Sequence, residues 1–171
     1  MTEPHRDECA FTYSLDFLPG WVSLTASALA EGDAVVLKGA FYADSGVEAA
    51  TLDVKVYGEE GVRPTPEELQ PLLLEWKDAQ VVSEPEVSYL ELPAGPAVRV
   101  QATVKTKGVL GFGGRLVEFI RYAVCPTIND DAVVVTGRWG TASDSGELTR
   151  MVDEMMPSLQ VTADDAHADG R

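Results

Sequence analysis

The sequence predicts an α+β domain, in which an antiparallel β-sheet of about six or seven strands is sandwiched by two main helices. Two observations predict it. Apolar and polar residues alternate with period two in several segments, which is typical of half-buried strands. Two other segments combine helix-capping residues with an apolar stripe of period 3.6. The strands come in runs and do not alternate regularly with helices, which favours α+β over a doubly wound parallel sheet.

Length and composition support one folded domain. The chain has 171 residues, of which 45% are hydrophobic and 24% charged, as is ordinary for a soluble globular protein. We expect the domain to span 11–161 between disordered tails at 1–10 and 162–171, which lack periodicity and large apolar residues. The start has no apolar signal segment and the longest apolar runs are too short to cross a bilayer, so we expect a cytoplasmic location.

The N-terminal third is expected to consist of strands and turns. Residues 11–17 alternate between apolar and polar and predict a strand, and Pro19-Gly20 predicts a tight turn after it. The residues expected to anchor the returning chain in the core are Trp21, Val22 and Leu24. A short helical turn is expected at 26–30. A strand pair is expected at 34–42 and 51–57, around a turn at 43–46.

A helix is expected at 65–79. Thr65 can cap its start, Pro66 suits the first turn because it needs no N–H there, and Glu68 can complete a capping box. Its apolar stripe consists of Leu69, Leu72, Leu73 and Trp76. Pro71 conflicts with an unbroken helix, since an interior proline clashes with the carbonyl four residues back. Either Pro71 kinks this helix, or a new helix begins there.

The C-terminal half predicts four strands and a final helix. The strands are expected at 87–92, 97–106, 116–125 and 132–139, and 107–114 forms a long glycine-rich hairpin loop. The helix begins near Gly146 with Asp144 as its cap and ends at Pro157, before a short edge segment at 159–161. The expected core comprises Trp21, Leu52, Val54, Val56, Leu73, Trp76, Val100, Ile120, Val134, Met151, Val152 and Met155.

Charge excludes some partners and suggests others. The chain carries 13 basic and 28 acidic residues, a net charge of −15, which disfavours nucleic acids and anionic membranes as partners. The charges are segregated: 59–91 has nine acids and two bases, whereas 97–121 has five bases and one acid. Internal pairing of charges explains such segregation as readily as a basic docking strip does.

Groups that commonly carry catalysis are scarce. Both histidines, His5 and His167, lie in the expected tails, away from a folded nucleophile. Cys125 is expected to be a small half-buried residue, and neither CxxC nor HExxH occurs. The glycines of 108–114 join two strands and do not open a helix, as those of a phosphate loop would. We therefore expect no enzyme, no metal and no cofactor.

Two alternatives remain open. A carboxylate-dependent hydrolase would need two acids converging in a pocket, one of them with a pKa raised by burial. A small-ligand binder would need an apolar cavity between sheet and helix, which Met151, Met155 and Met156 could line.

The order of these elements and two short motifs resemble the PsbP-like superfamily. Pro19-Gly20-Trp21 resembles its P-x-W start, and 158–161 (Ser-Leu-Gln-Val) resembles its SF-x-V ending. The superfamily includes the photosystem extrinsic protein, the Ran-binding Mog proteins and adaptors of bacterial type VI secretion, and the composition resembles its actinobacterial members. The resemblance covers 11–161 in outline. It implies an α/β/α sandwich that binds other proteins and has no shared catalytic site, and it transfers no functional residue.

We therefore predict a non-catalytic protein-interaction module, an adaptor or chaperone-like protein, that uses a sheet face and the loop at 107–114. Apolar anchors at the loop tip within a basic rim would combine affinity with fast association. The predicted partner-binding residues are Leu110, Phe112, Arg99, Lys105, Lys107, Arg115 and Arg121. The expected partner is another protein, and neither a nucleic acid nor a membrane.

Overall fold

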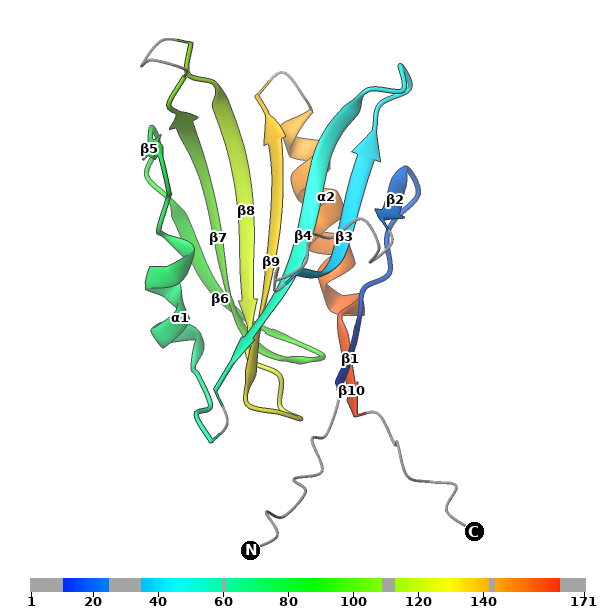
Figure 1. The fold of residues 1–171 in the computed structure, drawn as a ribbon, viewed down its shortest axis with the longest axis vertical. Helices are drawn as coiled ribbons and strands as arrows, with labels where there is room; N and C mark the ends of the chain where they lie inside the picture. Colours follow the sequence, from blue (N-terminus) through cyan, green and yellow to red (C-terminus); the bar gives the residue numbers. More distant parts are fainter. Residues whose placement is uncertain (1–10, 25–34, 60, 109–112, 142–143, 164–171) are drawn as a thin grey trace, which may run out of the picture.

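The structure, a computed structural model, describes residues 11–24, 35–59, 61–108, 113–141 and 144–163 (Figure 1). The described residues form an α+β fold with one sheet of eight strands, a second sheet of two strands and two α-helices. Every pairing between the described strands is antiparallel. The expected α+β class and antiparallel sheet are therefore confirmed. None of the described helices is long and apolar enough to cross a membrane.

The large sheet has the order β2-β3-β4-β9-β8-β7-β5, and β6 also pairs with β7. Its strands are β2 (Trp21–Leu24), β3 (Val35–Tyr42), β4 (Glu48–Gly58), β5 (Ala79–Val81), β6 (Glu86–Leu92), β7 (Gly95–Thr106), β8 (Leu116–Val124) and β9 (Asp131–Gly140). β6 and β5 share the outer edge of β7, since β6 pairs with its first half and β5 with its last three residues. The sequence pattern did not predict β5 or a strand at β2. Of the three core anchors expected in β2, Trp21 is buried, Val22 is exposed and Leu24 is only partly buried.

The small sheet joins the two ends of the domain. β1 (Phe11–Ser14) pairs with β10 (Gln160–Ala163), with Phe11 opposite Ala163 (Figure 1). β1 is thus shorter than the strand expected at 11–17. Two residues of the expected C-terminal tail, Thr162 and Ala163, belong to β10. The rest of both expected tails, and the turn expected at 26–30, lie outside the described residues.

One face of the large sheet packs against α2 (Ser145–Met155). Asp144 caps this helix as expected, since its Oδ1 accepts a hydrogen bond from the Glu147 backbone N–H at 3.1 Å. The helix is followed by a 3₁₀ turn, η3 (Met156–Ser158). The buried face of α2 packs with alternate residues of the central strands in one core cluster. This cluster includes Leu52, Val54, Ile120, Val135, Leu148, Val152 and Met155. Because strand side chains alternate, the residues between these belong to the other face.

The other face carries α1 (Pro66–Leu73). Thr65 and Glu68 form the expected capping box: the Glu68 N–H donates to Thr65 Oγ1, and the Thr65 N–H donates to Glu68 Oε2. Pro71 lies inside the helix, which begins at Pro66, so the second helix start at Pro71 is wrong. The helix also ends at Leu73, short of the expected residue 79. Leu73 packs with Val98, Val100, Ala123 and Val134 in a second core cluster.

The expected core residues are buried, with three exceptions. Val56, Trp76 and Met151 are only partly buried. Trp76 was expected on the apolar stripe of the first helix, but it follows the end of α1 and packs on the sheet through Phe119. Trp76 therefore belongs to the margin of the open sheet face, where the candidate site lies.

Candidate binding groove beside α1

α1 covers only part of its face of the sheet. Most of its contacts go to β7 and β8, near one edge of the sheet (Figure 1). On the rest of this face, β4 and β9 carry mostly polar and charged side chains, among them Lys55, Thr136 and Arg138. Between these strands and the end of α1 lies a groove of about 340 Å³. It is lined by Asp53, Lys55 and Tyr57 of β4, Phe119 and Arg121 of β8, Val134, Thr136 and Arg138 of β9, and Leu72, Leu73, Glu75 and Lys77 at the end of α1. This volume is at the low end of the roughly 300–1,000 Å³ of ligand sites.

Arg121 forms the wall of the groove where the end of α1 meets the sheet. Its Nη1 donates to the carbonyl of Leu73 at 3.1 Å and to that of Glu75 at 2.9 Å. The last carbonyls of a helix have no partner within the helix, and α1 has no basic residue in its own last turn. A strand residue thus supplies the positive charge that the end of a helix favours.

Two aromatic rings enclose the same guanidinium. The Arg121 Cζ lies 3.9 Å from the centre of the Trp76 ring and 5.3 Å from that of Phe119. The two rings are 5.0 Å apart. Burial lowers the pKa of Arg121 below its ordinary value, but such a guanidinium stays charged near neutral pH. The arrangement gives the groove a rigid, positively charged wall.

Three further bases line the groove. The Arg138 Nε donates to Thr51 Oγ1 at 2.9 Å, which leaves its remaining N–H groups available. The side chains of Lys55 and Lys77 make no hydrogen bond or ion pair with any described residue. The groove thus holds four bases and two acids, Asp53 and Glu75, on a chain whose net charge is −15.

Two buried polar atoms at the groove have no partner. Asp53 lines the groove, whereas Trp76 does not line it and only packs on Phe119 and Arg121, which do. Neither Asp53 Oδ1 nor Trp76 Nε1 makes a hydrogen bond with a described residue. A buried donor or acceptor left without a partner costs about 1–3 kcal/mol. Such atoms are rare in folded proteins and call for a partner such as an ordered water, an ion or a bound molecule. Trp21 Nε1, in the core cluster on the α2 face, is a third such atom among the described residues.

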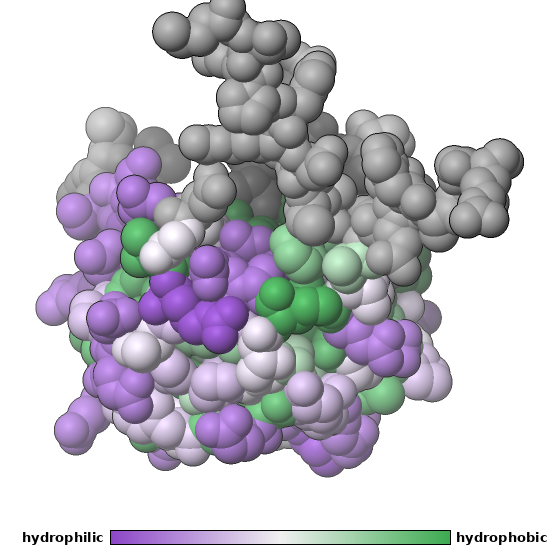
Figure 2. Space-filling view, turned by 90° about the horizontal axis from the view of Figure 1, so that it is seen from below, coloured by the Kyte–Doolittle hydropathy of each residue, from purple (hydrophilic) through white to green (hydrophobic). Residues whose placement is uncertain are grey.

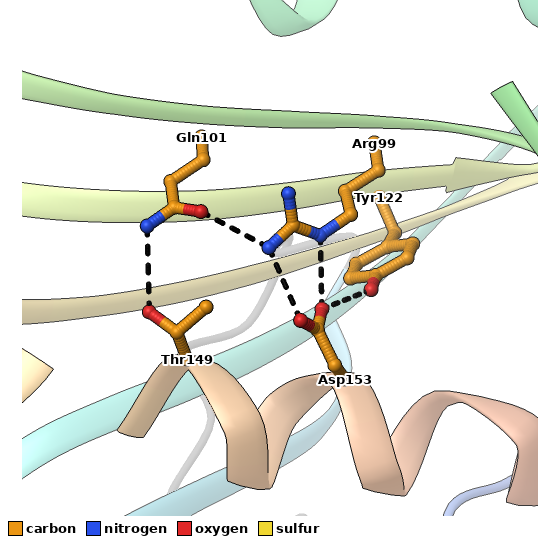
Figure 3. Close-up of polar contacts among 5 residues, drawn as sticks. All are labelled: Arg99, Gln101, Tyr122, Thr149 and Asp153. Carbon is orange, nitrogen blue, oxygen red and sulfur yellow. Dashed lines mark hydrogen bonds and ion pairs between the residues drawn. The ribbon is translucent and has the colours of Figure 1, made fainter. Parts of the chain in front are cut away.

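A second polar cluster lies under α2 and is internally satisfied (Figure 3). Arg99 of β7 forms an ion pair with Asp153 of α2 and donates to Gln101 Oε1 at 3.0 Å. Tyr122 donates its hydroxyl proton to Asp153, and Gln101 donates to Thr149 Oγ1 at 3.4 Å. Burial and the bond to Asp153 raise the pKa of Tyr122, which therefore stays protonated as a donor. These contacts position α2 and offer no binding surface.

The seven predicted partner-binding residues do not form one surface. Arg99 and Arg121 lie on opposite faces of the sheet, because Arg99 is opposite Tyr122 in the register and Arg121 is opposite Val100. The Arg99 side chain is only 16% exposed. Of the five that the structure describes, only Arg121 lines the groove. Sequence reasoning selected it for its charge and could not show its role at the end of α1.

The other predicted bases lie near the β7–β8 hairpin. Lys105, Lys107 and Arg115 are exposed there, and the Lys107 N–H donates to the Asp78 carbonyl at 3.2 Å. Asp78 follows Lys77, so the base of the hairpin adjoins one end of the groove. Leu110 and Phe112, the predicted apolar anchors, lie outside the described residues.

Other places in the described structure offer less chemistry. Cys125 is buried, and burial, with a smaller contribution from Glu67 and Glu68, raises its thiol pKa to about 11. No group of three potential metal ligands occurs among the described residues. At the end of the molecule viewed in Figure 2, the visible hydrophobic side chains are scattered among hydrophilic ones. This end includes the β8–β9 turn, which an ion pair between Arg63 and Asp130 ties to the segment before α1.

Comparisons with known proteins support the fold. No protein-family model matches the chain, and no curated protein matches it. Among solved structures, the fold is similar to that of LpqN, described as involved in cell envelope biogenesis of Mycobacterium tuberculosis. The similarity covers 92% of this chain and 87% of LpqN, with a TM-score of 0.58 and 14% sequence identity. At this identity the likeness shows a related fold and no function.

Proposed function

We propose that this chain is a non-catalytic protein-binding module, an adaptor or chaperone-like protein, and that the groove beside α1 is its binding surface. The observation that carries the proposal is the groove's composition. Four bases gather there on an acidic protein, and a buried carboxylate oxygen of Asp53 has no hydrogen-bond partner among the described residues. Internal packing does not require these features, whereas a bound partner would satisfy both.

The fold is consistent with this proposal. The likeness to LpqN and the arrangement of helices on the two faces support a PsbP-like α/β/α sandwich as the finer description. The members that the sequence resembles bind other proteins, and the β7–β8 hairpin adjoins the groove through Lys107. We therefore keep Leu110 and Phe112, which lie outside the described residues, as candidate anchors. We propose a cytoplasmic location, which fractionation of the native host would test.

A small apolar ligand is the second candidate, and a different pocket favours it. A pocket of about 640 Å³ lies between the β3–β4 turn and the start of α2. Its apolar lining comes from Phe41, Tyr42, Val47 and Leu148, but four acids also line it: Asp44, Glu48, Asp144 and Glu147. Native mass spectrometry of the purified protein would reveal a retained ligand and would favour this candidate.

Panning of a random peptide phage library tests the proposed function. The target variants are the wild type, Lys55→Glu/Arg138→Glu in the groove, and Arg63→Glu/Arg150→Glu as a control with the same change in charge. Arg63 and Arg150 are exposed and lie outside the groove. We expect enriched peptides that bind the wild type and the control but not the groove variant. Peptides that bind all three equally would contradict the proposal.

The hairpin and the hydrolase alternative need one variant each. Lys105→Glu/Lys107→Glu shows whether the hairpin bases contribute to the same binding. If only this variant loses the peptides, the binding surface is the hairpin and not the groove. A hydrolase screen with Asp53→Asn tests the catalytic alternative, because activity abolished by this substitution would overturn the non-catalytic assignment.

A further inference from the structure

We propose that the occupant of the groove is an acidic segment of a partner protein, bound in an extended conformation. This inference rests on the proposed function and adds the chemistry of the partner. Two features of the groove carry it: bases without anionic partners, and a buried acceptor that needs a donor.

The bases select for carboxylates. Lys55 and Lys77 have no counter-ion among the described residues, and Arg138 uses only its Nε, in a bond to a neutral hydroxyl. Arg121 adds a guanidinium that is held in place by two carbonyls and two rings, so it loses little freedom when an anion arrives. Acidic side chains on a bound segment would pair with these four bases.

The net charge of the whole chain does not prevent this binding. At physiological ionic strength, interactions between exposed charges are largely screened beyond about 8 Å. An acidic segment in the groove therefore interacts mainly with the four bases and two acids that line it. At lower salt, the remaining acids of the chain repel the acidic segment over longer distances. Lowering the salt should therefore strengthen binding less than it would on a uniformly basic surface.

The buried oxygen of Asp53 favours a peptide over a simple anion. A free carboxylate carries no donor for Asp53 Oδ1 near neutral pH, and inorganic phosphate, which keeps a hydroxyl donor, would still be repelled by the charge of Asp53. An extended peptide presents backbone N–H groups beside its acidic side chains and can satisfy Asp53 and the bases together. The half-exposed ring of Tyr57 and the ring of Phe119 provide apolar surface for the stems of those side chains.

Fluorescence anisotropy with defined peptides tests the inference. The probe is a labelled peptide of alternating Glu and Ser, about ten residues long, and its matched controls replace Glu by Gln or by Lys. We expect the Glu peptide to bind the wild type at 0.15 M salt about ten-fold or more tightly than either control. Lys55→Glu/Arg138→Glu should weaken it about ten-fold or more, and Arg63→Glu/Arg150→Glu less than about two-fold.

A milder variant and a competitor complete the test. Lys55→Gln/Arg138→Gln removes two charges without reversing them, and it should also weaken binding. It replaces the charge-reversal variant if that variant does not fold. Inorganic phosphate at matched ionic strength should not displace the peptide. Equal binding of the Glu and Gln peptides, equal weakening by the groove and control variants, displacement by phosphate, or no binding would each overturn the inference.

The panning experiment distinguishes a failure of the acidic-partner inference from a failure of the proposed function. Groove-dependent peptides that lack acidic residues would leave the groove as a binding surface and overturn only the acidic partner. An absence of groove-dependent peptides would overturn both.

Discussion

Arg99 of β7 and Asp153 of α2 form a two-point ion pair across the interface between sheet and helix, with Nε–Oδ1 at 2.9 Å and Nη2–Oδ2 at 3.1 Å (Figure 3). Burial opposes the charge of Arg99, but the hydrogen bonds and charge of Asp153 outweigh it, so the pKa of Arg99 is raised. The planar fork of a guanidinium matches a carboxylate in one orientation. The pair therefore sets how α2 lies on the sheet.

Asp153→Ala should destabilise the fold. It leaves the mostly buried Arg99 without its counter-ion and Tyr122 without an acceptor. A fully buried pair broken in this way costs about 3–5 kcal/mol, and the Asp153 side chain is 39% exposed, so we expect about 1–3 kcal/mol. Urea denaturation measures the change. Its control is Glu154→Ala, one position along α2, which breaks only the exposed pair with Arg150 and should cost about 0.5 kcal/mol or less. Equal losses would show that Arg99 and Asp153 do not hold α2.

Gly137→Ala should also destabilise the fold, because α2 packs closely on this glycine of β9. An added Cβ would lie 2.9 Å from Ile120 Cγ2 and 3.3 Å from Val152 Cγ2. Overpacking of this kind costs about 1–3 kcal/mol. Gly140→Ala, in the same strand, is the matched control, since its Cβ meets no atom within 4 Å and should leave the melting temperature unchanged or slightly higher. A Gly137→Ala protein as stable as the control would contradict the close packing.

Arg121→Lys should loosen the end of α1. A lysine keeps the charge but cannot donate hydrogen bonds to both carbonyls while stacking on the ring of Trp76. We expect a loss of about 1–2 kcal/mol and a red shift of tryptophan emission as Trp76 gains water. The same substitution in a Trp76→Phe background should give no red shift. A shift that persists there would assign the change to Trp21 or Trp139 instead.

Cys125 should be nearly inert in the folded protein. Its pKa of about 11, against an ordinary 9.0, lowers the thiolate fraction at pH 8 about 100-fold. Alkylation of Cys125 by iodoacetamide in a Cys9→Ser variant should therefore be at least about 50-fold slower in buffer than in urea. The raised pKa also means that the fold favours the neutral thiol, so its contribution to stability is complete below about pH 9 and is lost as the pH rises towards 11. Equal rates in buffer and urea would place the thiol in solvent.

The elements that local residues determine could be predicted from the sequence. The capping box of Thr65 and Glu68 and the cap at Asp144 need only neighbours three residues away. The alternating segments predicted β3, β4 and β6–β9 within a few residues. β5 has three residues and no pattern of its own, and it forms because β6 leaves the last residues of β7 unpaired.

The groove could not be predicted, because it depends on contacts between distant segments. Arg99 and Arg121 appear in one basic stretch of sequence, yet the strand register sends them to opposite faces. Counting charges cannot distinguish Arg99, which pairs with Asp153, from Arg121, which donates to the carbonyls at the end of α1. The open face exists because α1 is short and lies over β7 and β8, and no sequence pattern encodes where a helix docks.

Amide chemical-shift mapping tests the groove as the binding surface most directly. The ¹⁵N-labelled protein is titrated with the Glu–Ser peptide at 0.15 M salt. We predict the largest shifts along β4 and β9 at Asp53, Lys55 and Arg138 and at the end of α1, with small shifts on α2. Shifts concentrated at the β3–β4 turn and the start of α2, or spread evenly over all exposed bases, would contradict the account.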